Sequence, residues 1–488
     1  MSSASENGSS VARRWAIIAV GFAIALTARL LPVPASIATV GDATLTGDGL
    51  AAMGILLFTL LLWLTEAVPF HITGLVAVVL MALFRIESFA SIISIGFGNH
   101  IVAFFIGVLV LSSFISRSGL GNRISVLLLS RTGNSTAGIL FGFVSVGALI
   151  SMWITDVAVA AMLMPLGVTI LKEEGIKPLE SNFGRALMIS CAWGPIVGGI
   201  MTPAGAGPNP IAIGFLADMV GVELTFLGWM LYGVPAGILI IVPVWAVLML
   251  MFRPEISHLK KTREEMHEEY RKLPAMGREE RVTLWLFTLT VALWLGSPLL
   301  ESVLGISIPI SMPVLLTASI FFFPGVSETA WSSVEKDISW SSIVLILSGI
   351  SLGMMLYETG AAEWLAVATL GGIAGLHPFL LVLLVVLIVS FIKIFLSSNT
   401  VTATIMIPIM ITLAGAVGLD ALSVTMPAAI TASMAFIMVT SSPTNVIPYT
   451  AGYFTIRDFA VGGVIVSAVI APIVAAVIYV VGMLTGLY

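Results

Sequence analysis

Long runs of apolar residues, separated by short polar connectors, make up most of the chain from residue 15 onward. A bilayer core of roughly 30 Å requires about 20 apolar residues in each spanning helix. Helices are expected because each one satisfies its own backbone polar groups inside the bilayer. The pattern therefore predicts an all-α integral membrane protein with about eleven transmembrane helices, near residues 15–32, 50–64, 72–84, 99–116, 184–220, 226–252, 281–300, 307–324, 340–357, 423–455 and 460–486.

Two further apolar stretches, 135–171 and 378–419, are interrupted in the middle by polar residues. Each interruption is predicted to turn the chain back to the side from which it came, so both stretches are expected to be re-entrant hairpins. The polar tips are Thr155-Asp156 in the first hairpin and Ser397-Ser398-Asn399-Thr400 in the second.

The two hairpins belong to two halves of the chain that look alike. Pro165 lies nine positions after Asp156, and Pro408 lies nine positions after Asn399. A long apolar stretch broken by proline and asparagine follows each hairpin, with the breaks at 202–209 and 440–445. An odd number of predicted spans lies between the hairpins, so the repeats are expected to be inverted. Inverted pairs of broken helices are typical of a transporter whose site lies near the bilayer midplane.

The composition agrees with a membrane protein and excludes several other classes. Apolar residues make up 58% of the 488 residues and charged residues only 10%. The net charge of −5 is small and gives no indication of a nucleic-acid partner. Cys191 is the only cysteine, which excludes an intramolecular disulfide and a cysteine zinc cluster. The first apolar run is interpreted as a retained helix rather than a cleaved signal peptide.

The distribution of lysine and arginine predicts the orientation in the inner membrane. Basic residues lie before the first span, on both sides of the first hairpin, and throughout 253–281, whereas acidic residues predominate in the opposite connectors. The N-terminus is therefore expected to be cytoplasmic and the C-terminus to lie outside. Residues 253–281 are predicted to form an amphipathic cytoplasmic helix that joins the two halves.

The repeat predicts a division of the chain into five parts. Residues 1–134 and 282–377 are expected to form the scaffold helices of the two repeats, and 253–281 to form the linker. Residues 135–252 and 378–488 are expected to form the transport elements, each with a hairpin and a broken helix.

The breaks carry chemistry suited to an anion and a cation. Helix N-termini aimed at a break present N–H groups and the positive end of the helix dipole to an anion. Freed carbonyls and side-chain oxygens can coordinate sodium. Hydroxyl and amide side chains can hold a carboxylate without a permanent charge, so that release stays possible. Serine, threonine and asparagine also join neighbouring membrane helices as structural contacts, and this alternative stays open for any one motif.

Asp156 and Lys393 are the ionisable residues that lie deepest in the predicted membrane region. Such residues are costly, at roughly 2.5–3.5 kcal/mol each on insertion scales, and are candidates for function. Asp156 could bind sodium or carry a proton. Lys393 could act as a tethered cation in place of a sodium ion, form a structural ion pair with Asp156, or extend along the hairpin to water.

Several motifs resemble those of the divalent anion:sodium symporter family. Ser398-Asn399-Thr400 matches its Ser-Asn-Thr hairpin signature, and the segment 63–69, Trp-Leu-Thr-Glu-Ala-Val-Pro, is similar to an early family motif. Gly205…Pro208-Asn209 and 442–445 resemble its proline-asparagine loops. The resemblance covers residues from about 50 to the C-terminus.

The resemblance implies a sodium-coupled elevator-type carrier that works as a homodimer, with no cofactor and with a small anionic substrate and the lipid bilayer as partners. It implies a substrate site at Thr155, Asp156, Val157, Ser398, Asn399, Thr400 and Pro443. It implies one sodium site at Ser151, Asp156 and Gly205, and a second at Ser397, Asn399 and Ser441. The chain departs from the family at the first tip, where Ser-Asn-Thr is replaced by Thr155-Asp156-Val157, at Ala206-Gly207, and at Lys393.

The function predicted from these features is secondary active transport of a succinate-, citrate- or sulfate-like divalent anion. A proton-coupled carrier, a sodium-independent exchanger, and an ion antiporter or oxyanion exporter of similar architecture stay open as alternatives. An intramembrane enzyme is disfavoured, because the five histidines do not cluster with the hairpin tips and the proline-asparagine breaks to form a catalytic set. A channel is disfavoured because polar tips and proline loops suit a carrier that closes around its substrate.

Overall fold

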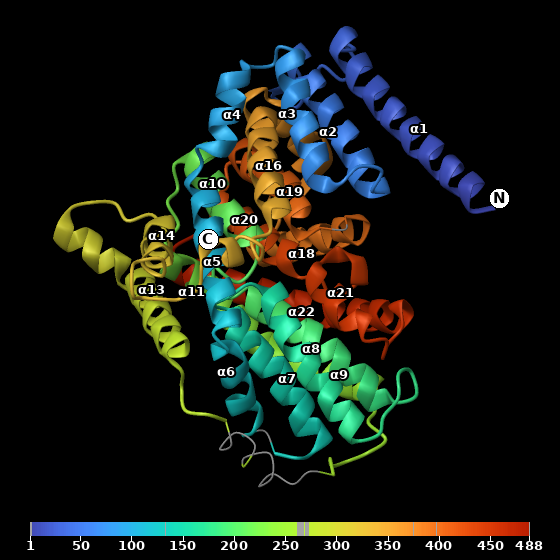
Figure 1. Ribbon diagram of the computed structural model, residues 1–488. Helices are drawn as coiled ribbons and strands as arrows, with labels where there is room; N and C mark the ends of the chain where they lie inside the picture. Colours follow the sequence, from blue (N-terminus) through green and yellow to red (C-terminus); the bar gives the residue numbers. More distant parts are fainter. Residues whose placement is uncertain are drawn as a thin grey trace.

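A computed structural model of the chain describes residues 2–131, 133–260, 268, 273–373, 375–396 and 398–487. It confirms the all-α architecture (Figure 1). Within these ranges nine helices are long and apolar enough to cross a membrane by length and composition. Both arms of the second hairpin belong to this set, whereas several of the eleven predicted spans are formed by shorter or divided helices. The described residues therefore contain nine candidate spanning helices, whereas the sequence predicted eleven spans.

The elements of the first half run as far as the predicted linker. They are α1 (Ser2–Leu30), the antiparallel strands β1 (Thr39–Val40) and β2 (Ala43–Thr44), α2 (Gly47–Thr65), α3 (Phe70–Leu83), α4 (Phe89–Phe97), α5 (His100–Arg117), α6 (Leu120–Leu129), α7 (Thr136–Ser151), α8 (Asp156–Glu173), α9 (Asn182–Gly199), α10 (Pro208–Val220) and α11 (Phe226–Met251).

The elements of the second half follow the same order. They are α13 (Arg278–Leu304), α14 (Ser311–Ile320), α15 (Trp331–Val334), α16 (Trp340–Glu358), α17 (Ala361–Leu370), the 3₁₀ turn η1 (Gly371–Ile373), α18 (Pro378–Phe395), α19 (Asn399–Ala416), α20 (Ala421–Ser433), the 3₁₀ turn η2 (Val439–Ser441), α21 (Pro443–Thr450) and α22 (Ile456–Thr485).

Three differences from the predicted elements have local causes. The spans 184–220 and 423–455 are each divided into two helices at the proline-asparagine break. The helices α4, α6, α15 and α17 were not predicted, because each has ten or fewer residues and gives no spanning signal. The predicted linker helix falls mainly on 261–272, of which the structure describes only Glu268. The described flanks 253–260 and 273–277 are not helical, so the prediction is wrong there.

The internal repeat extends through ten pairs of helices, from α2–α11 to α13–α22. Two of the pairs are joined by the same turn: α5 passes to α6 through Gly119, and α16 passes to α17 through Gly360. Both glycines have positive φ, 84° and 74°, which side chains other than glycine rarely adopt. In both hairpins the second helix has 18 residues and contains the repeated proline, Pro165 in α8 and Pro408 in α19.

Equivalent helices of the two halves pack in crossed pairs. In the scaffold helices α3 packs on α16, and α14 packs on α5. At the breaks α10 packs on α19 of the second hairpin, and α21 packs on α8 of the first. Figure 1 shows α7, α8 and α9 in the lower part of the molecule and α16 and α19 in the upper part. The hairpins therefore approach the centre from opposite ends.

Close packing of α7 on α9 fixes the first hairpin. An added Cβ at Gly198 would lie 2.1 Å from the carbonyl oxygen of Ala148, and one at Gly194 would lie 2.8 Å from that of Phe143. The backbones touch because these glycines have no side chain. Helix association within a membrane depends on such small residues, since lipid is as apolar as the helix surfaces.

The segment 253–260 fastens the base of the first hairpin. The N–H of Thr136 donates to the carbonyl of Ser257 (3.0 Å), and the N–H of Leu259 donates to that of Asn134 (2.8 Å). At the other end of the hairpin, the N–H of Lys260 donates to the carboxylate of Glu174 (2.7 Å). Both ends of the hairpin are therefore held by one stretch of chain.

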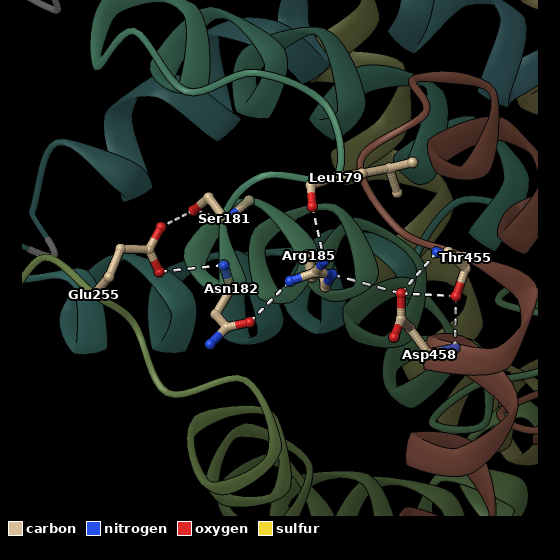
Figure 2. Close-up of polar contacts among 8 residues, drawn as sticks. Leu179, Ser181, Asn182, Arg185, Glu255, Thr455 and Asp458 are labelled. Carbon is tan, nitrogen blue, oxygen red and sulfur yellow. Dashed lines mark hydrogen bonds and ion pairs between the residues drawn. The ribbon is translucent and has the colours of Figure 1, made fainter.

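The same segment supplies the carboxylate that caps α9 (Figure 2). Glu255 accepts hydrogen bonds from the Ser181 hydroxyl and from the backbone N–H groups of Asn182 (3.1 Å) and Phe183 (3.2 Å). Nearby, Arg185 donates to the carbonyl of Leu179 and lies 3.5 Å from Asp458, which belongs to the capping box of α22. The ends of α9, α11 and α22 are thus joined.

The Glu255 contacts make a pH-dependent prediction. Burial alone raises the pKa of this carboxyl group, but hydrogen bonds from Ser181 and the backbone outweigh it and hold the pKa below its usual range. A depressed folded-state pKa means that the stabilisation exists above the unfolded-state pKa and disappears as the pH falls through the folded-state pKa. We expect Glu255→Gln to lower the free energy of unfolding by about 1 kcal/mol at pH 7. The loss is modest because Glu255 is largely exposed and solvent screens its charge.

The measurement is the thermal unfolding midpoint of the detergent-purified protein between pH 7 and pH 3. The midpoints of parent and Glu255→Gln should differ at pH 7 and converge in acid. Glu180→Gln, in the neighbouring turn, should leave the midpoint unchanged. A difference that persists undiminished at pH 3 would contradict the capping role.

Candidate functional site

Eight helix ends meet where the two hairpins and the two broken helices converge. The helices α8, α10, α19 and α21 begin there, and α7, α9, α18 and α20 end there. Contacts between the hairpin tips and the loops of the broken helices connect the four segments. Because helix N-termini carry partial positive charge and C-termini partial negative charge, one place offers groups for an anion and for a cation.

Asp156 is the first residue of α8 and is buried, with 6% of its surface exposed. Its N–H donates to the carbonyl of Gly205 (3.1 Å), which joins the hairpin tip to the first loop. Its Oδ1 accepts the N–H of Val157 (2.9 Å). Helix α21, which begins at Pro443, packs on α8, so the first hairpin meets the second broken helix.

The predicted first cation set is brought together. An added Cβ at Gly205 would lie 2.8 Å from the carbonyl oxygen of Ser151 and 2.7 Å from that of Gly199. Ser151 is fully buried. Among the residues that the structure describes, Ser151 Oγ and Asp156 Oδ2 are buried without a hydrogen-bond partner. A buried oxygen is costly to leave unsatisfied, and a cation held between these atoms would remove that cost.

The two breaks are built on the same asparagine arrangement. Asn209 Nδ2 donates to the carbonyls ten and seven residues earlier, of Gly199 and Thr202, both at 2.7 Å. Asn445 Nδ2 donates to the carbonyls at the same offsets, of Ala435 (2.7 Å) and Met438 (3.0 Å). Each asparagine therefore closes the loop between the two halves of its broken helix. These roles were missed, since sequence spacing alone does not indicate which carbonyls an amide reaches.

Asn209 also connects the two repeats. Its Oδ1 accepts a hydrogen bond from the Ser433 hydroxyl at the end of α20 (2.9 Å). The position equivalent to Ser433, twelve residues before the asparagine, is Val197 in the first repeat. Valine has no hydroxyl to donate, and Asn445 Oδ1 is buried without a partner among the described residues. The two loops are thus similar in backbone and different in their free oxygens.

The second hairpin tip lies against the first loop. The Ser398 hydroxyl caps α19 by accepting the N–H of Val401 (3.4 Å). An added Cβ at Gly207 would lie 3.1 Å from the Thr400 hydroxyl oxygen. Asn399 Oδ1 is buried without a partner in the described part of the chain. Ser397, predicted as a cation ligand, lies outside the described residues.

Exposure separates the predicted substrate residues from the predicted cation residues. Six of the seven predicted substrate residues are half-buried or exposed: Thr155, Val157, Ser398, Asn399, Thr400 and Pro443. The described cation residues Ser151, Gly205 and Ser441 are buried, as is Asp156, which belongs to both sets. Asn399, also assigned to both, is half-buried. An accessible face of hydroxyl and amide groups therefore lies beside a buried layer of oxygens.

Lys393 is buried in the last turn of α18, with 4% of its surface exposed. Its ammonium group donates to the carbonyl of Ala432 at the end of α20. The ion pairs found among the described residues do not include one between Lys393 and Asp156. The interpretation of these two residues as a contact ion pair is therefore wrong, and so is the one in which Lys393 extends to water.

The oxygen atoms available as metal ligands suit a weakly bound monovalent cation. Within the described ranges no three His, Cys, Asp or Glu side chains are grouped so as to hold a metal ion. The candidate ligands are hydroxyls, amides and backbone carbonyls, with Asp156 as the carboxylate. Oxygen ligands of this kind suit hard cations, and a cation bound by them can still be released and transported.

The family described as "Sodium:sulfate symporter transmembrane region" matches residues 11–487. The sodium-dependent dicarboxylate transporter SdcS of Staphylococcus saprophyticus is 28% identical over 452 residues, which cover 89% of this chain and 86% of that protein. SdcS of Staphylococcus aureus strain USA300 is 28% identical over 448 residues, which cover 88% and 85%.

Two solved transporter structures share the fold. The YdaH transporter of Alcanivorax borkumensis matches with a TM-score of 0.54 and 15% identity, covering 82% of this chain and 88% of that one. MtrF of Neisseria gonorrhoeae, described with a class of antimetabolite efflux pumps, matches with a TM-score of 0.54 and 13% identity, covering 96% and 94%. At these identities the likeness concerns the fold alone.

Proposed function

The chain belongs to the sodium:sulfate symporter family and is a multi-pass secondary anion transporter, and we propose that it carries a small divalent anion together with sodium. The proposed substrates are di- or tricarboxylates such as succinate or citrate, or sulfate, and the proposed place is the inner membrane. The two SdcS relatives carry sodium-dependent dicarboxylate transport in their names, which supports this choice without deciding the anion.

Four helix N-termini beside an accessible polar face support the anion half of the proposal. Thr155, Ser398, Asn399 and Thr400 supply hydroxyl and amide groups, and the dipoles of α8, α10, α19 and α21 supply positive potential without a fixed charge. An anion held in this way is attracted strongly enough to bind and weakly enough to leave. This is the balance that a carrier needs at its midplane site.

The buried oxygens around Asp156 carry the sodium half of the proposal. A bare carboxylate would repel a neighbouring dianion and is costly in the membrane, so it requires neutralisation when substrate is bound. Ser151 Oγ and Asp156 Oδ2 are buried and unpartnered, within the described residues, beside the carbonyls of Ser151 and Gly199. A sodium ion among these atoms would neutralise the carboxylate and satisfy its free oxygen.

Proton coupling is the alternative that a specific observation favours. The first hairpin tip has an aspartate where the resembling family has an asparagine, and a carboxyl group can be neutralised by a proton as well as by sodium. The wider alternatives, a sodium-independent exchanger and an ion antiporter or oxyanion exporter, lack a comparable observation for the first cation site. The elevator motion, the homodimer, the five-part division, the cytoplasmic N-terminus and the external C-terminus stay predictions.

Counterflow in proteoliposomes tests the proposal. Vesicles loaded with unlabelled succinate, citrate or sulfate would receive the labelled anion outside, with sodium, potassium and pH varied one at a time. Exchange that requires sodium and does not change with pH supports the proposal. Exchange that follows pH in the absence of sodium would replace it with proton coupling, and no exchange of any of these anions would contradict the substrate class.

A further inference from the structure

The position of Lys393 in the second hairpin corresponds to an apolar residue in the first. Lys393 lies six residues before Asn399, and Ile150 lies six residues before Asp156. Both positions are buried, so the replacement puts an ammonium group where the other repeat has a hydrocarbon side chain. A buried charge is costly unless neighbouring groups compensate it, so the groups around the ammonium must stabilise a cation.

The surroundings of the ammonium group are those of a cation-binding position. Its partner, the carbonyl of Ala432, belongs to the last turn of α20, where carbonyls have no partner within the helix and the dipole is negative. A small cavity of ≈ 10 Å³ lies beside it and is lined by Lys393, Ser390, Ser441 and Ser467 together with apolar residues. Ser441 is one of the residues predicted to hold the second sodium ion.

We infer that the ammonium group of Lys393 takes the place of the second sodium ion, so that this carrier binds one transported cation fewer than its two cation positions would allow. The inference rests on the proposed function and makes it more specific. The cavity beside Ser441 has about the room of one water molecule, and a sodium ion there would be repelled by the neighbouring ammonium group.

The arrangement also leaves Asp156 without a direct contact to Lys393. The hydrogen bond of the ammonium group goes to Ala432, and the ion pairs among the described residues do not include Lys393 with Asp156. Within the described residues Oδ2 of Asp156 has no hydrogen-bond partner, so it is available for a mobile cation at the first position. One cation is covalently attached and travels with the protein, and the other must be supplied by the solution.

A tethered cation changes the charge that moves in each transport cycle. An attached ammonium group returns with the empty carrier, whereas a sodium ion is released on the other side. Replacing Lys393 with a small neutral residue should allow a second sodium ion to enter and should add one positive charge to each cycle. At a membrane potential of 100 mV, one extra charge increases the accumulation ratio at equilibrium about 50-fold.

The test compares four variants with the parent in proteoliposomes. Lys393→Ala opens the cavity and should raise the Hill coefficient for sodium by about one. It should also increase substrate accumulation about 50-fold at an inside-negative potential of about 100 mV. Lys393→Met fills the space without a charge or an oxygen and should impair uptake with no gain in sodium dependence. Lys393→Arg keeps the charge and should keep the sodium stoichiometry of the parent. Ile150→Ala, at the equivalent position of the first hairpin, should leave that stoichiometry unchanged.

A second measurement covers variants that are stable and inactive. The purified Lys393→Ala protein should be stabilised against heating by sodium, relative to potassium, more steeply than the parent. The inference is overturned if the parent transports an anion and Lys393→Ala keeps the parental sodium dependence and charge. It is also overturned if the purified variant gains no sodium-dependent stabilisation. If the parent itself transports none of the tested anions, the proposed substrate class fails, and the sodium stabilisation still decides the role of Lys393.

Discussion

In the Asp156→Asn variant, the sodium concentration needed to support substrate binding should rise about 10- to 100-fold. The estimate follows from the loss of one charge-assisted contact, worth about 1.5–3 kcal/mol, when a carboxylate becomes an amide. The amide keeps the shape of the side chain and an oxygen that can still accept the N–H of Val157. The protein should therefore fold, and the remaining oxygens, including that of Ser151, should support some transport.

The measurement is the substrate concentration for half-maximal uptake at several sodium concentrations and at pH values from 6 to 8. If Asp156 carries a proton instead, affinity in the parent should fall as pH rises, and Asp156→Asn should remove that dependence. Asp420→Asn is the matched control, since Asp420 caps α20 outside the site and asparagine caps equally well. If Asp156→Asn keeps the parental affinity, sodium dependence and pH dependence, Asp156 has no part in coupling.

At a substrate concentration near the dissociation constant of the parent, Asn399→Ala should abolish the thermal stabilisation that substrate gives to the purified protein. Asn399 begins α19, and its Oδ1 is buried without a partner among the described residues. Ser398 and Thr400 on either side are half-buried with it. We expect binding to weaken about 10- to 100-fold, because the amide contacts a charged ligand and alanine offers nothing in its place.

The control for this variant is Val157→Ala at the equivalent of Thr400 in the first hairpin. Val157 has no polar group in its side chain, so the change should have a mild effect on substrate binding. Stabilisation by succinate, citrate and sulfate would be compared in the three proteins at fixed sodium. Unchanged binding by Asn399→Ala would remove the second hairpin tip from the substrate site.

The helices that could be predicted are those long enough to cross the bilayer, because a run of about 20 apolar residues is itself the signal of a spanning helix. The repeat could be predicted because Pro165 and Pro408 lie at the same distance from their hairpin tips. The ten-residue helices α6 and α17 gave no such signal. They are recognised as a pair only because Gly119 and Gly360 make the same left-handed turn.

Residue type and spacing predicted the candidate site residues, whereas the contacts among them could be found only in the folded chain. The tips, the breaks and the two deep charges were apparent from residue type and spacing. The roles of Asn209, Asn445 and Ser433 depend on which carbonyl or amide lies opposite after folding. The irregular course of 253–260 was missed for the same reason, because a polar stretch with helical composition is held instead by Thr136, Glu174 and the end of α9.

The crossed packing of the two repeats governs how the protein can be made. A ribosome delivers α7 to α11 to the membrane before α19, α20 and α21 have been synthesised. During that interval α8 has no α21 to cover it, α10 has no α19, and the oxygen of Asn209 has no hydroxyl from Ser433. The nascent first half must therefore persist as an incomplete intermediate. Its two polar helix starts are closed only when the second half arrives and inserts in the opposite sense.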